Sequence, residues 1–221
     1  ARTLPPETLR SLAITLEVGG QAELGALAEQ LLSAGYTRCE QVEGVGQFAL
    51  RGGILDVFSP LMDQPVRCEF FDDEIDSMGA FDPGTQRRTR NVSSARILPA
   101  AEVLPGLAPG GLTHLAEQIE KLAVKYAKKE NGEKIAQTLR GDAERFRSGA
   151  EVNGLDRYLS LIYPDAAGGA DYLPPDAVVF LCEGGRVEQR VKTVLLQLHQ
   201  DTEALMEAGL MVGDAAEVCL S

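Results

Sequence analysis

Two stretches of the sequence decide the fold: RGGILDVFSP at residues 51–60 and PVRCEFFDDEIDSMGAFDPGTQRR at residues 65–88. Short runs rich in Val, Ile and Phe alternate in them with turn residues, a pattern typical of antiparallel strands. With the neighbouring runs they predict a meander of strands at residues 47–50, 54–58, 65–71, 75–81 and 93–98. We interpret Gly52-Gly53 as a bulge or sharp bend, and Asp72-Asp73-Glu74 as a hairpin turn.

The sequence on the N-terminal side adds a strand and a helix to this meander. Residues 11–18 alternate polar and apolar side chains as a strand does. After Gly19-Gly20, leucines at helical spacing predict a helix at residues 22–34, and Gly35 suits its C-terminal end. The predicted fold class of this part is therefore α+β, an antiparallel sheet with a packed helix.

A stretch rich in Pro, Gly and Ala at residues 99–111 is the internal boundary. It divides the chain into domains at residues 1–100 and 101–221. Helical stripes dominate beyond it, at residues 112–126, from there to about 147, and again at 187–198. The apolar run at residues 177–182 predicts one buried strand, which needs partner strands from elsewhere. We expect the second part to be a mainly helical α/β segment of an incomplete parallel-sheet domain.

Composition limits the function. The 221 residues are 44% hydrophobic, as in ordinary globular proteins, and the formal charge of −12 opposes a binding mode that depends on neutralising phosphates. No apolar run approaches the length of a membrane span, so we expect a cytoplasmic chain with no membrane partner. The chain opens without Met and closes directly after a helical pattern, which suggests a piece of a longer polypeptide.

The sequence contains no recognisable catalytic or metal site. The Gly pairs lack the Lys and hydroxyl of a phosphate-binding loop, and His114 and His199 are far apart. Four acidic residues around the predicted hairpin turn could form a metal or acid/base site, but carboxylates in such a turn usually only solvate it: Asp72, Asp73, Glu74 and Asp76. The cysteines are widely scattered without metal-ligand spacing, and we expect ordinary reduced thiols: Cys39, Cys68, Cys182 and Cys219. We therefore predict no catalysis, metal or cofactor in this chain.

One strand has a face suited to binding. Alternation along residues 65–71 directs three side chains toward the core: Val66, Cys68 and Phe70. Arg67 and Phe71 then face solvent, where a large aromatic beside a cation is typical of interfaces. Arg51 also points outward and could share this patch. The alternative is that Phe71 packs under the helix at residues 22–34 while both arginines pair with nearby acids.

Two further groups of basic residues are predicted to be solvated faces, with local phosphate contacts as the alternative. The first surrounds a turn and contains Arg87, Arg88 and Arg90. The second forms a stripe on a predicted helix and contains Lys121, Lys125, Lys128 and Lys129. Interspersed glutamates would weaken a continuous positive field along that helix.

The stretches quoted first, with ARILPA at residues 95–100, resemble the region shared by two bacterial nucleotide-excision-repair families, UvrB and the transcription-repair coupling factor (Mfd). The resemblance covers roughly residues 10–100. Further on, GLDRYLSLIYP at residues 154–164 and DYLPPDAVVFL at residues 171–181 look like the coupling factors. The chain is thus identified as an internal fragment of that family, with its UvrB-like domain 2 and most of domain 1b.

The resemblance implies a non-catalytic docking module. Domain 2 resembles the surface by which UvrB docks on UvrA, and the family's contact positions match Arg51, Arg67 and Phe71. It would recruit nucleotide excision repair to stalled RNA polymerase. Ser59 departs from the family, where a Pro is usual, which should alter a loop more than the patch. ATP and Mg, DNA translocation and the grip on RNA polymerase would belong to other parts of the parent protein.

Three alternatives stay open at this point. The chain could come from UvrB, the damage-verifying helicase, with the same face docking UvrA. It could be a local DNA-binding domain that uses the two basic groups. It could also be the remnant of a nucleotide-binding domain, with residues 100–221 as part of an ATPase-like shell.

Overall fold

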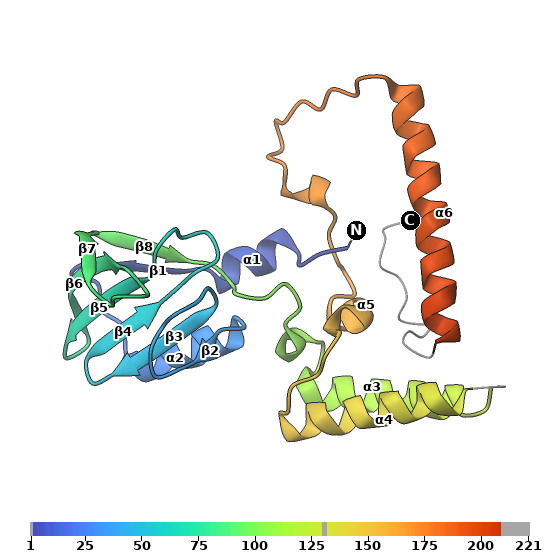
Figure 1. The fold of residues 1–221 in the computed structure, drawn as a ribbon, viewed down its shortest axis with the longest axis horizontal. Coiled ribbons are helices and arrows are strands. Elements are labelled where there is room, and N and C mark those ends of the chain that lie inside the picture. The colour runs from blue at the N-terminus through green and yellow to red at the C-terminus, as the bar shows by residue number, and fades with distance from the viewer. Residues whose placement is uncertain (1, 130–131, 209–221) are drawn as a thin grey trace. The chain divides into compact units, whose positions relative to one another are not determined.

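The computed structural model describes residues 2–129 and 132–208, and these form two compact units (Figure 1). One unit is Pro6–Leu104. The other contains residues 2–5 together with the described residues from Pro105 onward. The short N-terminal stretch belongs to this second unit because Thr3 pairs with Ala167 in an antiparallel bridge.

The first unit is an antiparallel sheet with a helix on its inner face. Its elements are α1 (Pro6–Leu12), β1 (Ile14–Glu17), α2 (Leu24–Ser33), β2 (Thr37–Arg38), β3 (Gln47–Arg51), β4 (Ile54–Val57), β5 (Val66–Phe71), β6 (Glu74–Phe81), β7 (Arg88–Asn91) and β8 (Ser94–Ile97). Six strands lie in the order β2-β3-β4-β5-β6-β7, where only the β2–β3 pair is parallel, and β1 pairs separately with β8. The predicted α+β class is confirmed.

All five predicted strands form, but only the first four lie in the meander: the fifth, β8, pairs with β1 instead, and the unpredicted β7 follows β6 in the sheet. The expected strand at residues 11–18 is shorter, since α1 extends to Leu12 and β1 starts at Ile14. Gly52-Gly53 forms the predicted sharp bend and not a bulge: Arg51 pairs with Ile54, so the two glycines are the turn itself, and Gly52 takes the positive φ of 59° that such a turn requires. The Asp72-Asp73 hairpin turn is confirmed.

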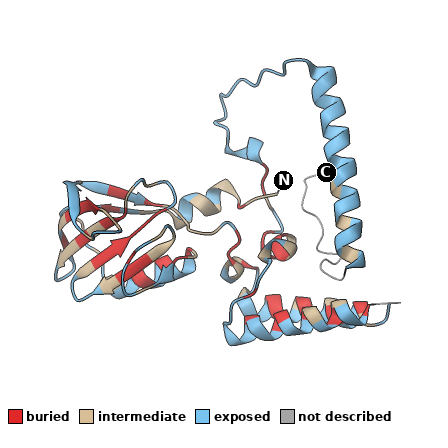
Figure 2. Ribbon diagram, viewed as in Figure 1, coloured by how far each residue is buried: buried red, intermediate tan, exposed pale blue. Residues whose placement is uncertain are grey.

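The main core lies between α2 and the inner face of the sheet (Figure 2). Leu27, Ala28 and Leu31 of α2 are buried, and the sheet contributes alternate residues such as Phe48 and Cys68. The helix begins after Glu23, whose carboxylate accepts hydrogen bonds from the backbone N–H groups of two residues in the first turn. Burial of this face fixes which residues of β3, β4 and β5 point the other way.

A smaller cluster covers one end of the outer face of the sheet. It consists of Val42, Ala49, Phe58 and Phe81, all buried. Ser59, next to it, is fully buried and its hydroxyl accepts a hydrogen bond of 3.0 Å from the backbone N–H of Leu98. A proline at this position could not accept this hydrogen bond. The serine that replaces the usual proline therefore links the end of β4 to the end of β8.

The second unit is helical in its described residues. Its elements are η1 (Pro105–Leu107), α3 (Gly111–Tyr126), α4 (Glu133–Ser148), η2 (Leu155–Tyr158), α5 (Leu159–Ile162), η3 (Gly169–Tyr172) and α6 (Gly184–Glu207). Helices α3 and α4 pack side by side through apolar stripes that include Leu115, Ile119, Ala136 and Leu139 (Figure 1). No helix in the described part of the chain is long and apolar enough to cross a membrane.

The segment of η2 is fixed to α4 by a buried polar contact. The hydroxyl of Tyr158 donates a 2.6 Å hydrogen bond to Asp142 Oδ2, and the Tyr158 ring stacks edge-on against Phe146. Arg157 lies 3.4 Å from the same carboxylate oxygen and supplies the opposite charge. The motif at residues 154–164 therefore has a structural role here.

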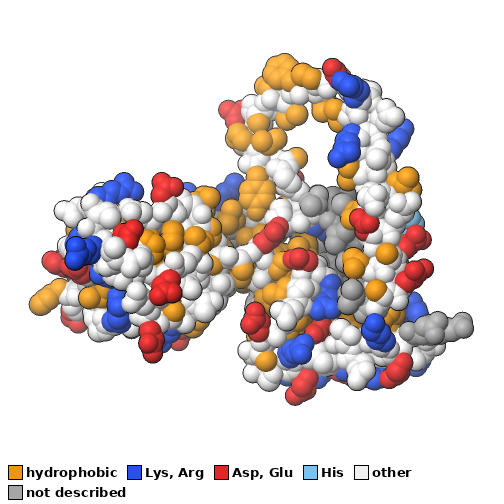
Figure 3. Space-filling view, in the orientation of Figure 1, with side chains coloured by type: hydrophobic (Ala, Val, Ile, Leu, Met, Phe, Trp, Pro, Cys, Tyr) orange, Lys and Arg blue, Asp and Glu red, His pale blue; other side chains and the backbone are white. Residues whose placement is uncertain are grey.

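The prediction of a buried strand at residues 177–182 is wrong for this structure. These residues form no strand, and Val178 and Phe180 are 74% and 83% exposed. The helix α6 follows as predicted, yet it has no buried residue, and hydrophobic side chains lie on the surface of the segment that leads into it (Figure 3). The run is apolar, as a buried strand requires, but the described residues of this unit contain no strand with which residues 177–182 could pair.

Candidate partner-binding site

The register of three strands assembles polar side chains on the outer face of the sheet. Asp56 of β4 lies between Ala49 of β3 and Arg67 of β5. Because side chains on one face recur every second residue, Arg51 and Phe71 share this face with them. The smaller hydrophobic cluster occupies one end of this face. Asp56 and the two arginines lie next to that cluster.

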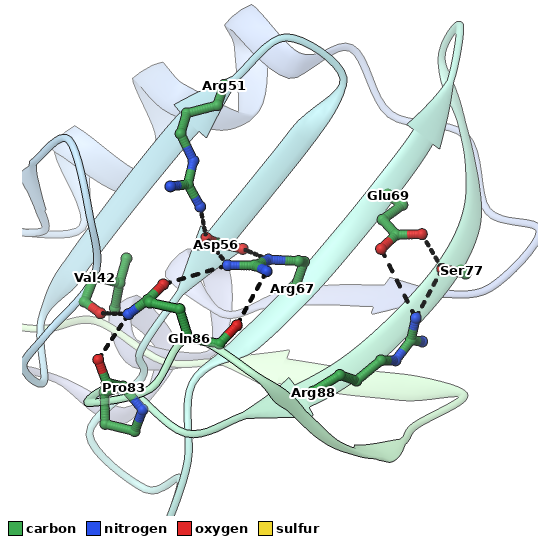
Figure 4. A network of polar contacts seen from close by, with 9 residues as sticks. All are labelled: Val42, Arg51, Asp56, Arg67, Glu69, Ser77, Pro83, Gln86 and Arg88. Carbon is green, nitrogen blue, oxygen red and sulfur yellow. Dashed lines mark hydrogen bonds and ion pairs between the residues drawn. The ribbon is translucent and has the colours of Figure 1, made fainter.

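Asp56 pairs with both arginines (Figure 4). Its side chain is 0% exposed. Oδ1 accepts a 2.7 Å hydrogen bond from Arg67 Nε, and Oδ2 accepts bonds of 2.8 Å from Arg67 Nη2 and 2.6 Å from Arg51 Nη2. A buried carboxylate needs such partners, and a bidentate arginine provides the strongest kind. The hydrogen bond with Asp56 raises the pKa of Arg67. Two guanidiniums and one carboxylate give this group a formal charge of +1.

Gln86 holds Arg67 from the opposite side. Arg67 donates to the Gln86 side-chain oxygen at 3.3 Å and to its backbone oxygen at 3.4 Å. The Gln86 amide nitrogen donates in turn to the backbone oxygens of Val42, at 3.0 Å, and Pro83, at 2.7 Å (Figure 4). The guanidinium also lies 4.6 Å from the centre of the Phe81 ring, within cation–π range. Arg67 is thereby restrained on three sides.

A second polar group lies further along the same face. Glu69 accepts a 2.8 Å hydrogen bond from Ser77, and Arg88 lies 3.8 Å from Glu69 while donating to the backbone oxygen of Met78 (Figure 4). Arg88 crosses directly over Gly79, where a Cβ would lie 2.0 Å from its Nε. The glycine is therefore required for Arg88 to reach Glu69.

Phe71 is the exposed aromatic of this face. It ends β5, immediately before Asp72 with its positive φ of 55°, and it is 80% exposed. The alternative in which it packs under α2 is therefore wrong. The other half of that alternative is right, because both arginines do pair with an acid, Asp56. Arg51 remains 45% exposed and Arg67 21% exposed despite this pairing.

Of the other basic residues predicted from the sequence, only Arg88 contributes to the polar contacts on this face. Arg87 and Arg90 are exposed. Arg90 of β7 pairs with Ala80 of β6, and Ala80 pairs with Val66 of β5, whose side chain lies in the core. Arg90 is therefore on the side of the sheet opposite to Arg67. Lys121 and Lys125 are exposed on α3, in the second unit. Phosphate binding by these side chains stays a prediction.

Sequence reasoning missed the roles of Asp56 and Gln86. Asp56 carried a signal, because it interrupts the apolar run ILDVF, but its pairing with two arginines depends on the strand register. Gln86 carried no such signal. Its contact with Arg67 depends on a positive φ, which the sequence does not reveal at a residue other than glycine. In the described residues, no three His, Cys, Asp or Glu side chains are grouped so that they could hold a metal ion. The acidic turn therefore does not form such a group.

Comparison with known families identifies the first unit. The family described as the UvrB interaction domain matches residues 14–102, which contain the whole outer face. Residues 14–102 are thus similar to the UvrB interaction domain family. The resemblance inferred from the strands and the acidic turn is thus confirmed over this segment.

Similarity to named proteins extends past the UvrB interaction domain. The chain is 31% identical over 218 residues to the transcription-repair-coupling factor of Bacillus subtilis, which covers 96% of the chain. That of Staphylococcus epidermidis is 28% identical over 209 residues, or 93% of the chain. The factor of Myxococcus xanthus is 46% identical over 103 residues, 47% of the chain and 9% of that protein. The chain spans 18% of the length of the first two relatives.

Proposed function

We propose that the UvrB interaction domain of this chain is a docking module for UvrA, with Arg51, Arg67 and Phe71 in contact with the partner. The observation that carries the proposal is Phe71, a large aromatic that is 80% exposed on the same face of the sheet as two partly exposed arginines. Aromatic residues and arginine are the side chains most enriched among binding hot spots. The family match supports the choice of a repair partner.

The chemistry of docking follows from the three side chains. Phe71 would enter an apolar pocket on the partner, where burying its ring contributes most of the affinity. The free N–H groups of the arginines would donate to carboxylate or carbonyl oxygens around that pocket. Asp56 already neutralises one of the two charges, so the partner meets a single net positive charge and a low desolvation cost.

The wider role depends on residues outside the chain. We infer that in a full-length protein this module brings nucleotide excision repair to stalled RNA polymerase. ATP hydrolysis with Mg, movement on DNA and binding of RNA polymerase would belong to the remaining sequence, since this chain corresponds to 18% of the Bacillus subtilis relative. The chain itself would perform no catalysis.

The test is direct binding of purified UvrA to this chain and to Phe71→Ala, Arg51→Ala and Arg67→Ala. We expect Phe71→Ala to weaken binding about 30-fold or more, as removal of a hot-spot aromatic does. Leu61→Ala is the matched control for the aromatic, because Leu61 is equally exposed at 80% in the same domain. Arg90→Ala is the control for the arginines, because it lies on the opposite side of the sheet.

The outcomes separate cleanly. Loss of binding in the three variants, each shown by circular dichroism to be folded, with unchanged binding in both controls supports the docking face. Equal losses in Leu61→Ala or Arg90→Ala would show that the contacts are elsewhere on the domain. A wild-type chain that does not bind UvrA at all would overturn the proposed function.

A further inference from the structure

Asp56 influences the outer face without being able to touch a partner. Its side chain has no solvent exposure, because the strands on either side and the two guanidiniums enclose it. Any effect of Asp56 on binding must therefore act through Arg51 and Arg67. Its own position is set by the backbone, since β4 is paired on both sides.

Gln86, which is half-buried, also holds Arg67. It adopts a φ of 61°, in the left-handed region that is unfavourable for a residue with a side chain. In this conformation its side-chain and backbone oxygens both face Arg67, and its amide nitrogen is fixed by two backbone oxygens. The turn that carries it is closed by Asp82, which accepts hydrogen bonds from the backbone and hydroxyl of Thr85.

Holding an arginine in place has a physical consequence for binding. A free arginine samples many rotamers, and a partner that orders it loses affinity in proportion to the freedom removed. An arginine that is already ordered avoids this loss. Arg67 has a bidentate carboxylate, a glutamine and an aromatic ring around it, while one fifth of its surface, 21%, stays open to a partner.

We propose that Asp56 and Gln86 are positioning residues for docking: they hold Arg51 and Arg67 in the orientation that the partner requires, before it arrives. Asp56 acts on both arginines and Gln86 on Arg67 alone. This inference rests on the proposed function, since it concerns the same face and the same partner.

Gln86→Gly is the sharpest test, because glycine accepts the positive φ without strain and removes only the side chain. We expect this variant to bind UvrA roughly three- to tenfold more weakly, as loss of one hydrogen bond to a charged group does. In an Arg67→Ala background the same change should alter the dissociation constant less than about twofold, because its route to the partner is gone. In an Arg51→Ala background its effect should remain.

Glu183→Gly is the matched control for this substitution. Glu183 has a φ of 53° and lies in the second unit, so the change to glycine relieves the same backbone conformation away from the face. For Asp56→Asn, which we expect to weaken binding by about tenfold, the control is Asp142→Asn. Asp142 is also a buried carboxylate with tyrosine and arginine partners, in the second unit.

A readout without UvrA separates positioning from a general loss of structure. The ¹⁵N relaxation of the Arg67 Nε–H group in the free chain should show lower order in Gln86→Gly, with circular dichroism and melting temperature close to wild type. Unchanged order, or lower order with unchanged affinity for UvrA, would overturn the inference while leaving the docking function intact. If Asp56→Asn fails to fold, Gln86→Gly decides alone, and a wild-type chain that does not bind UvrA overturns both.

Discussion

At the scale of single residues, Asp56 controls the electrostatics of the outer face. A carboxylate that is withdrawn from water remains an anion only where donors replace its hydration. Arg67 supplies two of the three short bonds to Asp56 and Arg51 the third. The two arginines are therefore unequal in what they contribute to the fold, although both lie on the proposed binding face.

This inequality gives the first prediction. Arg67→Ala should lower the free energy of unfolding by about 2–3 kcal/mol, because it leaves most of a buried charge unpaired, and Arg51→Ala by less than about 1 kcal/mol. Urea unfolding followed by circular dichroism measures both. Adding Asp56→Asn to Arg67→Ala should recover part of the loss. Equal losses for the two arginines would contradict the geometry.

The cysteines give a second prediction. Burial raises the pKa of the Cys68 thiol to about 12, and burial also raises that of Cys39, whereas Cys182 is exposed. Since the thiolate is the nucleophile, iodoacetamide at pH 8 should alkylate Cys182 first and Cys68 last, as peptide mass spectrometry can follow. Cys219 lies outside the described residues. Similar rates for Cys182 and Cys68 in the folded chain would contradict the burial of Cys68.

The same shift has a defined sign for stability. The folded-state pKa of Cys68 lies above its unfolded value of 9.0, so burial of the neutral thiol contributes stability below about pH 9. That contribution is lost as the pH rises toward about 12. Cys68→Ala should therefore flatten the alkaline end of the stability profile.

At the scale of elements, the sequence predicted the strands that are rich in apolar residues and missed the strands whose residues are exposed, β2 and β7. Alternation requires only local order, so residues 65–71 could be assigned faces, and Phe71 could be placed outside. β7 escaped prediction because all four of its residues are exposed, and only backbone pairing with β6 makes it a strand. The pairing of Asp56 with two arginines needed the register of three strands, which no local pattern contains.

The contact between η2 and α4 gives an element-scale prediction. Tyr158→Phe removes the hydroxyl that donates to Asp142, so a buried carboxylate loses its shortest bond, and we expect a loss of about 1–3 kcal/mol. Thermal unfolding measures this change. Tyr126→Phe is the control, because Tyr126 is also buried and its ring, whose centre lies 4.2 Å from Lys129 Nζ, stays in the variant. If Tyr126→Phe and Tyr158→Phe lowered the free energy of unfolding equally, the hydrogen bond from Tyr158 to Asp142 would not be the cause of the loss.

At the scale of the whole molecule, the two units differ in how much apolar surface they bury. The first has a continuous core between α2 and the sheet. In the second, α3 and α4 bury a shared stripe, but α6 buries none of its residues. The sequence hypothesis of an incomplete domain accounts for this contrast: the apolar run at residues 177–182 and the stripe on α6 would pack against polypeptide outside the chain.

Hydrogen exchange tests that hypothesis. A helix that buries none of its residues gains little stability from packing, so amides of α6 should be protected less than about tenfold, whereas those inside α3 and α4 should reach on the order of a thousandfold. In a longer chain that includes the expected partner strands, protection of residues 177–207 should rise toward that of α3, because burial of the apolar stripe would stabilise the helix. The hypothesis would be contradicted if α6 were protected as strongly as α3 in the present chain. It would also be contradicted if the protection of α6 did not rise in a longer chain.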